Sequence, residues 1–271
     1  VAGCGSNKSQ QSANSYKVVD DQGVEVDFDQ KPTRIVSMTL STDDILLGLV
    51  KPERVVCANN LVDDPISSNI AELGKNIPNK VRHPKVEEIL AMEPDLVIAP
   101  DWGDIDYVDS LRNMGIKVVV MKGPKCLQDI RDNITLMSKA VGEPERGEKL
   151  ISMMDSKLAE IKAKVDKIPQ DQRKRVLLIS LMSNYGGKDI IFLPTYTAHG
   201  TFDIQKFHDK YLKDPALQQM KAIQSDSIKE PRDSYIYSAS QDFCFAVQEI
   251  AYTVYGDEFK LEDQQHLSAV D

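Results

Sequence analysis

The sequence predicts an α/β protein of two lobes, each with a mainly parallel sheet flanked by helices, joined by one long helix. From Arg34 to about Met121, short β-branched and apolar runs alternate with stretches of helical periodicity. Strands that are apolar at consecutive positions and separated by helices are typical of a parallel sheet covered on both faces. A long amphipathic stretch follows, and strand-like runs resume near residue 175.

The first lobe is expected to span residues 16–142. A helix is expected to begin at Ser41–Asp44, where hydroxyl and acidic side chains suit a first turn. A short helix over Lys85–Glu93 is expected to stop at Pro94, and a further helical stretch covers Tyr107–Leu111. The predicted strands are four short apolar runs: Arg34–Met38, Val55–Ala58, Leu96–Ala99 and Lys117–Val120.

Residues 143–168 are predicted to form the connecting helix. Its apolar residues recur at alternating spacings of three and four: Ile151, Met154, Leu158, Ile161 and Val165. At 1.5 Å per residue such a helix reaches roughly 30–35 Å, about the diameter of a small domain. We therefore interpret it as a strut between lobes, and an ordinary peripheral helix is the alternative.

The second lobe is expected to span residues 169–271. Strands are predicted at Arg175–Ser180 and Ile190–Leu193, and a last helix at Ser240–Tyr255 is closed by Gly256. The two strands lie too close in sequence for a parallel pair, which needs a connection of about a dozen residues. Either Tyr185–Gly187 forms the turn of an antiparallel hairpin, or a segment is lacking near position 188/189. We favour the lacking segment.

The N-terminal residues Val1–Cys4 have the pattern of a bacterial lipobox, and residues 5–15 form a polar stretch that suits a flexible tether. We therefore expect residues 1–15 to hold a lipid-anchor site at Cys4. The alternative is a disordered N-terminus that happens to carry a cysteine. No run approaches the ~18 apolar residues of a membrane span, so membrane attachment is expected only through this anchor.

Net charge, cysteine spacing and the lack of catalytic motifs argue against several classes of protein. The net charge is −9 and the pI near 5.1, which argues against nucleic-acid binding. Cys57, Cys126 and Cys244 have no short spacing, so we expect core thiols and neither a disulfide framework nor a zinc site. No GxSxG, HExxH or Walker pattern is present, and we expect no enzymatic activity and no intrinsic cofactor.

Three stretches carry a resemblance to a known family: Arg34–Ser37, Val86–Ala99 and Leu111–Val119. They resemble the substrate-binding lipoproteins of ABC importers, in the cluster that serves ferric siderophores, haem and cobalamin and joins its lobes by a single long helix. The resemblance implies a monomeric, extracytoplasmic, lipid-anchored receptor. It implies that an iron complex, a ferric siderophore or haem, binds between the lobes and is delivered to an ABC permease and ATPase complex.

A cobalamin or other corrinoid receptor of the same importer type is the alternative. Two other classes stay open: a metal-dependent enzyme on two α/β lobes, and a lipoprotein adhesin or sensor. The resemblance also implies that Glu87, on the outer face of the first lobe, pairs with permease arginines. The alternative for it, as for Glu88 beside it, is a solvated surface residue.

Candidate ligand contacts follow the predicted strands, because ligands of such sheets bind beyond the carboxyl ends of the strands. They are Met38, Asn60, Lys80, Arg82, His83, Trp102, Tyr185, Tyr196, His199, Arg232 and Tyr235. An amphipathic Trp102 suits stacking on a flat ligand, with core packing as its alternative. His199 is the candidate metal ligand, and hydrogen bonding is its alternative role. His208 and His266 are expected at the surface.

Overall fold

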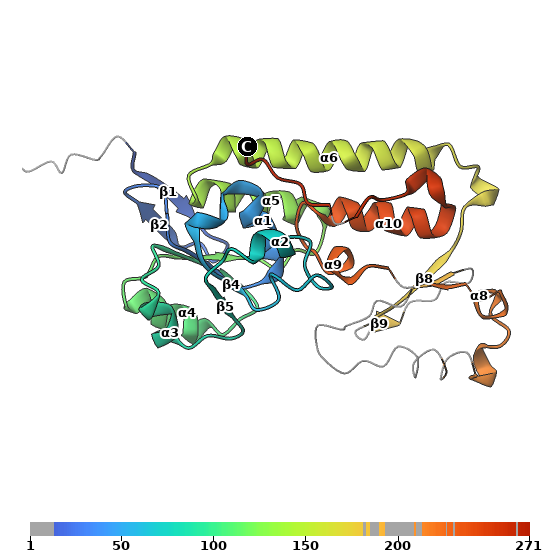
Figure 1. The fold of residues 1–271 in the computed structure, drawn as a ribbon, viewed down its shortest axis with the longest axis horizontal. Coiled ribbons are helices and arrows are strands. Elements are labelled where there is room, and N and C mark those ends of the chain that lie inside the picture. Colours follow the sequence, from blue (N-terminus) through green and yellow to red (C-terminus); the bar gives the residue numbers. More distant parts are fainter. Residues whose placement is uncertain are drawn as a thin grey trace, which may run out of the picture.

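The computed structural model describes residues 14–180, 183–184, 190–192, 209, 213–225, 227–229, 231–263 and 265–271. A five-stranded sheet with flanking helices forms one end of the molecule, and helix α6 extends from it toward a second sheet (Figure 1). No helix within these described ranges is long and apolar enough to cross a membrane.

The first sheet is entirely parallel, with strand order β5-β4-β3-β6-β7. Each strand is short, and a helix follows it in the chain. The strands predicted near residues 35, 55, 96 and 118 are confirmed. Strand β5 was not predicted, because its residues are only partly buried and form no apolar run. The strands are β3 (Ile35–Ser37), β4 (Val55–Asn59), β5 (Asn79–Val81), β6 (Leu96–Pro100) and β7 (Val118–Met121).

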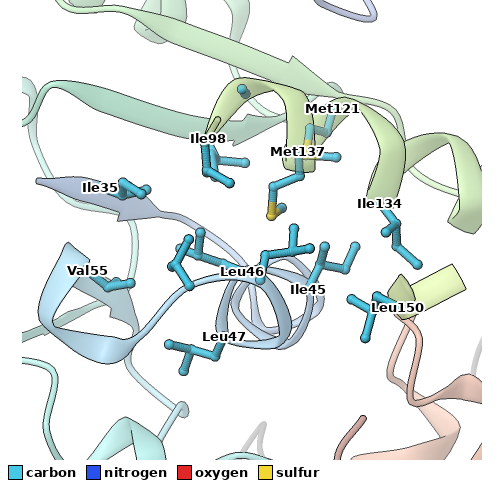
Figure 2. Packing of buried hydrophobic residues seen from close by; sticks show 14 of the residues in the cluster. Ile35, Ile45, Leu46, Leu47, Val55, Ile98, Met121, Ile134, Met137 and Leu150 are labelled. Carbon is cyan, nitrogen blue, oxygen red and sulfur yellow. The ribbon is translucent and has the colours of Figure 1, made fainter. Parts of the chain in front are cut away.

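Helices cover both faces of this sheet, as its uninterrupted apolar strands predict. One cluster packs Ile35 and Ile98 of the sheet against Leu46 and Met137 of the helices (Figure 2). A second cluster packs the other face, including Val97, against α3 and α4. The flanking helices are α1 (Leu40–Leu49), α2 (Ala71–Gly74), α3 (Val86–Ala91), α4 (Ile105–Asn113) and α5 (Leu127–Ala140). The predicted α/β class is confirmed.

An N-terminal hairpin of β1 (Tyr16–Val19) and β2 (Glu25–Phe28) lies against this lobe. The Tyr16 hydroxyl donates to the Ala140 carbonyl at 2.9 Å. The Asp20 carboxylate is buried and accepts from Arg112 at 2.7 Å. These contacts fix the point at which the chain enters the folded body.

The long helix α6 (Pro144–Asp166) begins and ends within two residues of the predicted boundaries. It packs along α5 and α10 (Phe243–Tyr255), which lie beneath it in Figure 1. The C-terminal residues therefore do not stay with the second sheet. Phe245 and Ala269 belong to the core cluster of the first lobe.

The second sheet has the order β11-β10-β8-β9. Strand β10 runs parallel to β8, so the antiparallel hairpin interpretation of these two strands is wrong. A short strand, β9, pairs antiparallel with β8. The remaining elements are β8 (Val176–Ser180), β9 (Ser183–Asn184), β10 (Ile190–Phe192), α8 (Lys221–Gln224), β11 (Ile228–Lys229) and α9 (Asp233–Ile236), with 3-10 turns at Pro52–Arg54, Gln170–Gln172, Pro215–Leu217 and Asp257–Phe259.

Candidate functional site

A pocket of about 560 Å³ opens at the carboxyl-terminal edge of the first sheet. Its volume lies in the range of about 300–1,000 Å³ that is usual for small-molecule sites. The pocket lies where the order of the strands changes direction. From β3 the chain first adds β4 and β5 on one side of the sheet, and then β6 and β7 on the other. Such a switch point leaves a crevice at the strand ends. The lining residues are Met38, Thr39, Leu40, Asn59, Asn60, Leu61, Arg82, His83, Pro84, Ala99, Pro100, Trp102, Gly103, Asp104, Tyr107 and Val108.

Five of the predicted ligand contacts meet in this pocket. They come from four different loops, after β3, β4, β5 and β6, and the parallel topology brings these loops together. They are Met38, Asn60, Arg82, His83 and Trp102. Residues in the same loops, such as Thr39 and Leu61, line the pocket beside them.

One wall of the pocket is aromatic. Trp102 is 68 % exposed, so the alternative of a core tryptophan is wrong. The loop is held by the Asp101 side chain, which accepts from the Gly123 backbone N–H at 2.9 Å. Pro84 and Pro100 extend the apolar surface. A ring presented in this way is available to stack on a flat ligand.

Tyr107 of α4 also lines this wall, and the sequence did not nominate it. Burial, followed by the charges of nearby Cys57 and Glu88, raises the pKa of its hydroxyl to about 12. The hydroxyl oxygen is enclosed and has no hydrogen-bond partner among the described residues. Because this oxygen is enclosed, the ring of Tyr107 and not its hydroxyl forms part of the pocket surface.

Another part of the lining is polar. Helix α1 begins there with a neutral capping box: the Thr42 N–H donates to Thr39 Oγ1 at 3.2 Å, and the Thr39 N–H donates to Thr42 Oγ1 at 3.2 Å. A helix N-terminus attracts anions through its free N–H groups and its dipole. Arg82, which is exposed, adds a full positive charge to the lining. This wall is therefore suited to carboxylate or other anionic oxygen atoms.

His83 adopts a left-handed backbone conformation with φ of 52°. For a residue with a Cβ this conformation costs roughly 1–3 kcal/mol, although histidine tolerates it better than most. In this conformation the exposed imidazole of His83 lies at the pocket rim, directly after Arg82 in the sequence.

A buried carboxyl group lies next to the pocket on α1. Asp43 Oδ2 accepts from the backbone N–H of pocket residue Asn59 at 2.9 Å. Burial raises the pKa of Asp43 well above its ordinary value, against the hydrogen bonds from Ser37 and Asn59. The contact fixes the loop after β4 to the first turns of α1, and Leu61 N–H donates to Asn59 Oδ1 at 3.1 Å within that loop.

Other predicted contacts lie elsewhere. Lys80 is not part of the pocket lining, and its ammonium pairs with Asp63 at 3.1 Å. Arg232 pairs with Asp263 at 3.8 Å and lies over the ring of Tyr235.

Tyr235 was expected in the cleft, but it is 1 % exposed and lies in the core. Its hydroxyl accepts from Gln265 N–H at 2.7 Å, and its ring packs on Phe245. Tyr185, Tyr196 and His199 lie outside the described residues. So does Cys4. No group of three metal-ligating side chains occurs in the described part of the chain.

Glu87 and Glu88 are both exposed in the first turn of α3, but their surroundings differ. Glu88 Oε2 accepts from Lys85 N–H at 2.7 Å and so caps the helix. Glu87 makes no ion pair with any described residue, so its charge is open to a partner.

Two expectations about which side chains are buried are wrong. Cys126 is exposed at the start of α5, whereas Cys57 and Cys244 are core thiols as expected. His266 is not a surface group, because its side chain is 10 % exposed and its Nδ1 lies 2.7 Å from Asp242 Oδ2. His208 lies outside the described residues.

Comparisons with known proteins agree with this architecture. Residues 35–192 match a family described as periplasmic binding protein. The chain is 25 % identical over 189 residues to an uncharacterised ABC transporter substrate-binding lipoprotein of Bacillus subtilis, covering 66 % of this chain and 59 % of the relative. It is 25 % identical over 181 residues to a probable siderophore-binding lipoprotein of the same organism, covering 66 % of this chain and 53 % of the relative. The chain thus spans between half and three fifths of the length of these relatives.

A solved structure has the same fold. The periplasmic haem-binding protein of Roseiflexus sp. RS-1, in its apo form, superimposes with a TM-score of 0.66 and 19 % sequence identity. The superposition covers 82 % of this chain and 97 % of that chain.

Proposed function

Because the chain belongs to the periplasmic binding protein family, a family of solute-binding receptors, we propose that it is an extracytoplasmic receptor for an iron complex, a ferric siderophore or haem. The pocket at the carboxyl edge of the first sheet supplies one side of the binding site. The observation that carries the proposal is that an exposed Trp102 ring and the charged Arg82 side chain line the same pocket.

The two walls of the pocket fit the two parts of such a ligand. Haem and many ferric siderophores combine flat or apolar surface with anionic oxygen atoms. Trp102 and Pro84 offer the apolar surface, and the Tyr107 ring extends it. Arg82 and the start of α1 offer the positive potential that carboxylates and chelate oxygens require.

The second side of the site is proposed from the sequence. Tyr185, Tyr196 and His199 follow second-lobe strands and would face the first lobe across the ligand. His199 is the candidate iron ligand, since imidazole is a natural ligand for iron. In this proposal the iron complex is cargo, and the receptor carries out no chemistry on it.

The cellular setting completes the proposal. Lipidation of Cys4 would hold the receptor at the outer surface of the cell membrane through a tether over residues 5–15. A monomer would then present Glu87, which is exposed and unpaired among the described residues, to arginines of an ABC permease. A rim charge of this kind contributes more to steering than to affinity.

A fluorescence titration tests the ligand class. Trp102 is the one tryptophan of the sequence, so its emission reports on this pocket alone. We expect haem or a ferric siderophore to quench it with a saturable curve, and Arg82→Ala to weaken that binding. Saturable quenching by cobalamin alone would favour the corrinoid receptor instead, and no quenching by any of these ligands would contradict the proposal.

A further inference from the structure

A second group of titratable side chains lies in the core and takes no part in lining the pocket. The Ser238 hydroxyl donates to Asp44 Oδ2 at 2.5 Å, and Ser240 Oγ lies 3.3 Å from the same oxygen. The His266 ring lies 2.7 Å from the Asp242 carboxylate. All five residues are buried or nearly so, and they come from α1, the turn before α10, and the C-terminal segment.

This cluster attaches the C-terminal residues to α1. The Gln241 side chain donates to the Asp44 carbonyl at 2.7 Å, and the Leu267 N–H donates to Asp242 Oδ1 at 2.8 Å. The Ala269 N–H then donates to the Gly48 carbonyl at 2.8 Å. Groups about 200 residues apart in the sequence thus meet along one side of α1.

The other end of the same helix forms the pocket wall. Thr39 and Leu40 line the pocket, and the next residue, Ser41, accepts from the Ala239 N–H at 3.1 Å. Asp43 holds the pocket loop at Asn59. The first turns of α1 therefore connect the buried cluster directly to the ligand site.

The charge of the cluster is balanced only when Asp44 is neutral. Burial, and then the Asp242 charge, raises the pKa of Asp44 to about 7, although His266, Ser238 and Ser240 oppose this. Burial opposes protonation of His266, but the charge and hydrogen bond of Asp242 dominate and raise its pKa to about 9. With Asp44 ionised, two carboxylates share one imidazolium in the core, which is costly.

The remaining charges near α1 have other partners. Asp43, on the same helix, is itself held toward the neutral form by burial. Charges on α5 and α6 are engaged elsewhere: Arg131 pairs with Asp155, Arg146 donates to the Leu49 carbonyl, and Lys149 pairs with Asp271. On the strand side, Cys57 is a neutral thiol with a pKa raised by burial to about 12.

We propose that Asp44, Asp242 and His266 form a proton-controlled latch, in which loss of the Asp44 proton loosens the C-terminal segment and the first turn of α1 at the pocket. The latch is closed at mildly acidic pH and weakens as the pH rises. It makes the order of the ligand site depend on pH, whichever ligand is bound.

Hydrogen–deuterium exchange between pH 5.5 and 8.5 tests the latch in the ligand-free protein. Protection factors of residues 265–271 and of the first turn of α1 should fall by up to about tenfold per pH unit as the pH rises toward the Asp44 pKa of about 7, because opening then releases the proton, and the Asp44 contribution should level off above it. Collisional quenching of Trp102 should change over the same range. Asp44→Asn keeps the acceptor oxygen but cannot ionise, so its profiles should lose the fall below pH 7 and keep only the fall above pH 6.5 that His266 supplies. The exposed-site control Asp109→Asn should follow the wild type.

A pH-independent wild type, or the same pH dependence in Asp44→Asn, would overturn the proposal. Should Asp44→Asn fold poorly, the wild-type carboxyl can be titrated directly by carbon-13 NMR. The latch requires Asp44 to titrate near pH 7, and an ordinary carboxyl pKa near 4 would refute it.

Discussion

Removing the Trp102 ring isolates the contribution of the aromatic wall to binding. The side chain is 68 % exposed and lies in a loop rather than in a core cluster. Trp102→Ala should therefore change the free energy of unfolding by no more than about 0.5 kcal/mol, as is usual for surface sites. A ligand that covers the ring would bury most of this exposed surface.

The expected loss of binding follows from that burial. Covering a large apolar side chain is worth about 1.5–3 kcal/mol, which corresponds to a loss of affinity of roughly 10- to 150-fold. Isothermal titration calorimetry measures this loss, and thermal unfolding measures stability. Ile105→Ala is the matched control, because Ile105 is 48 % exposed, lies three residues away and does not line the pocket. Unchanged affinity, or a large drop in melting temperature, would refute the reasoning.

Three further predictions follow from the described contacts. Glu87→Arg should leave ligand affinity unchanged while lowering uptake and ATPase stimulation in a reconstituted transporter, because the new arginine would face the arginines of the permease. Glu88→Gln is the control, and normal transport by Glu87→Arg would place the docking surface elsewhere. The free energy of unfolding should fall as the pH rises from 6.5 through 9, because folded His266 keeps a proton that the unfolded chain releases; denaturant titrations should show His266→Gln losing this dependence, on the order of 3 kcal/mol. Gly147→Ala should destabilise the chain by about 1–3 kcal/mol, because a Cβ would collide with Ser138 across the α5–α6 contact; Ser138→Gly should restore much of the melting temperature, and a neutral Gly147→Ala would contradict this packing.

The sequence pattern predicted the first lobe well for a physical reason. Buried parallel strands such as β6 must be apolar at consecutive positions, and the following helix must be amphipathic, so both leave a clear pattern. Strand β5 leaves none, because Asn79–Val81 is only half-buried. The hairpin of β1 and β2 is similarly short, and its stability comes from contacts with distant residues such as Ala140.

The pocket was predictable to the extent that topology determines it. Loops after parallel strands converge at one edge, so Met38, Arg82 and Trp102 could be nominated without coordinates. Tyr107 was missed because it lies on a helix whose pattern gave no sign of a hydroxyl facing inward. Tyr235 was expected in a loop, but it lies on the short helix α9, and a backbone group distant in sequence, Gln265 N–H, helps to hold it in the core.

His266 shows the same limit for charged groups. The four residues before it, Glu262–Gln265, are polar, which suggests a surface position, but its partner Asp242 lies 24 residues away. Only the folded chain brings the Asp242 carboxylate next to the His266 imidazole, and this contact offsets the cost of burying the imidazole.

A crystal structure of the protein with its ligand tests the central proposal most directly. We predict an iron complex bound against the Trp102 ring, with an anionic oxygen within hydrogen-bond distance of Arg82 and of the first turn of α1. A ligand bound away from this edge of the first sheet, or one without iron, would contradict the account.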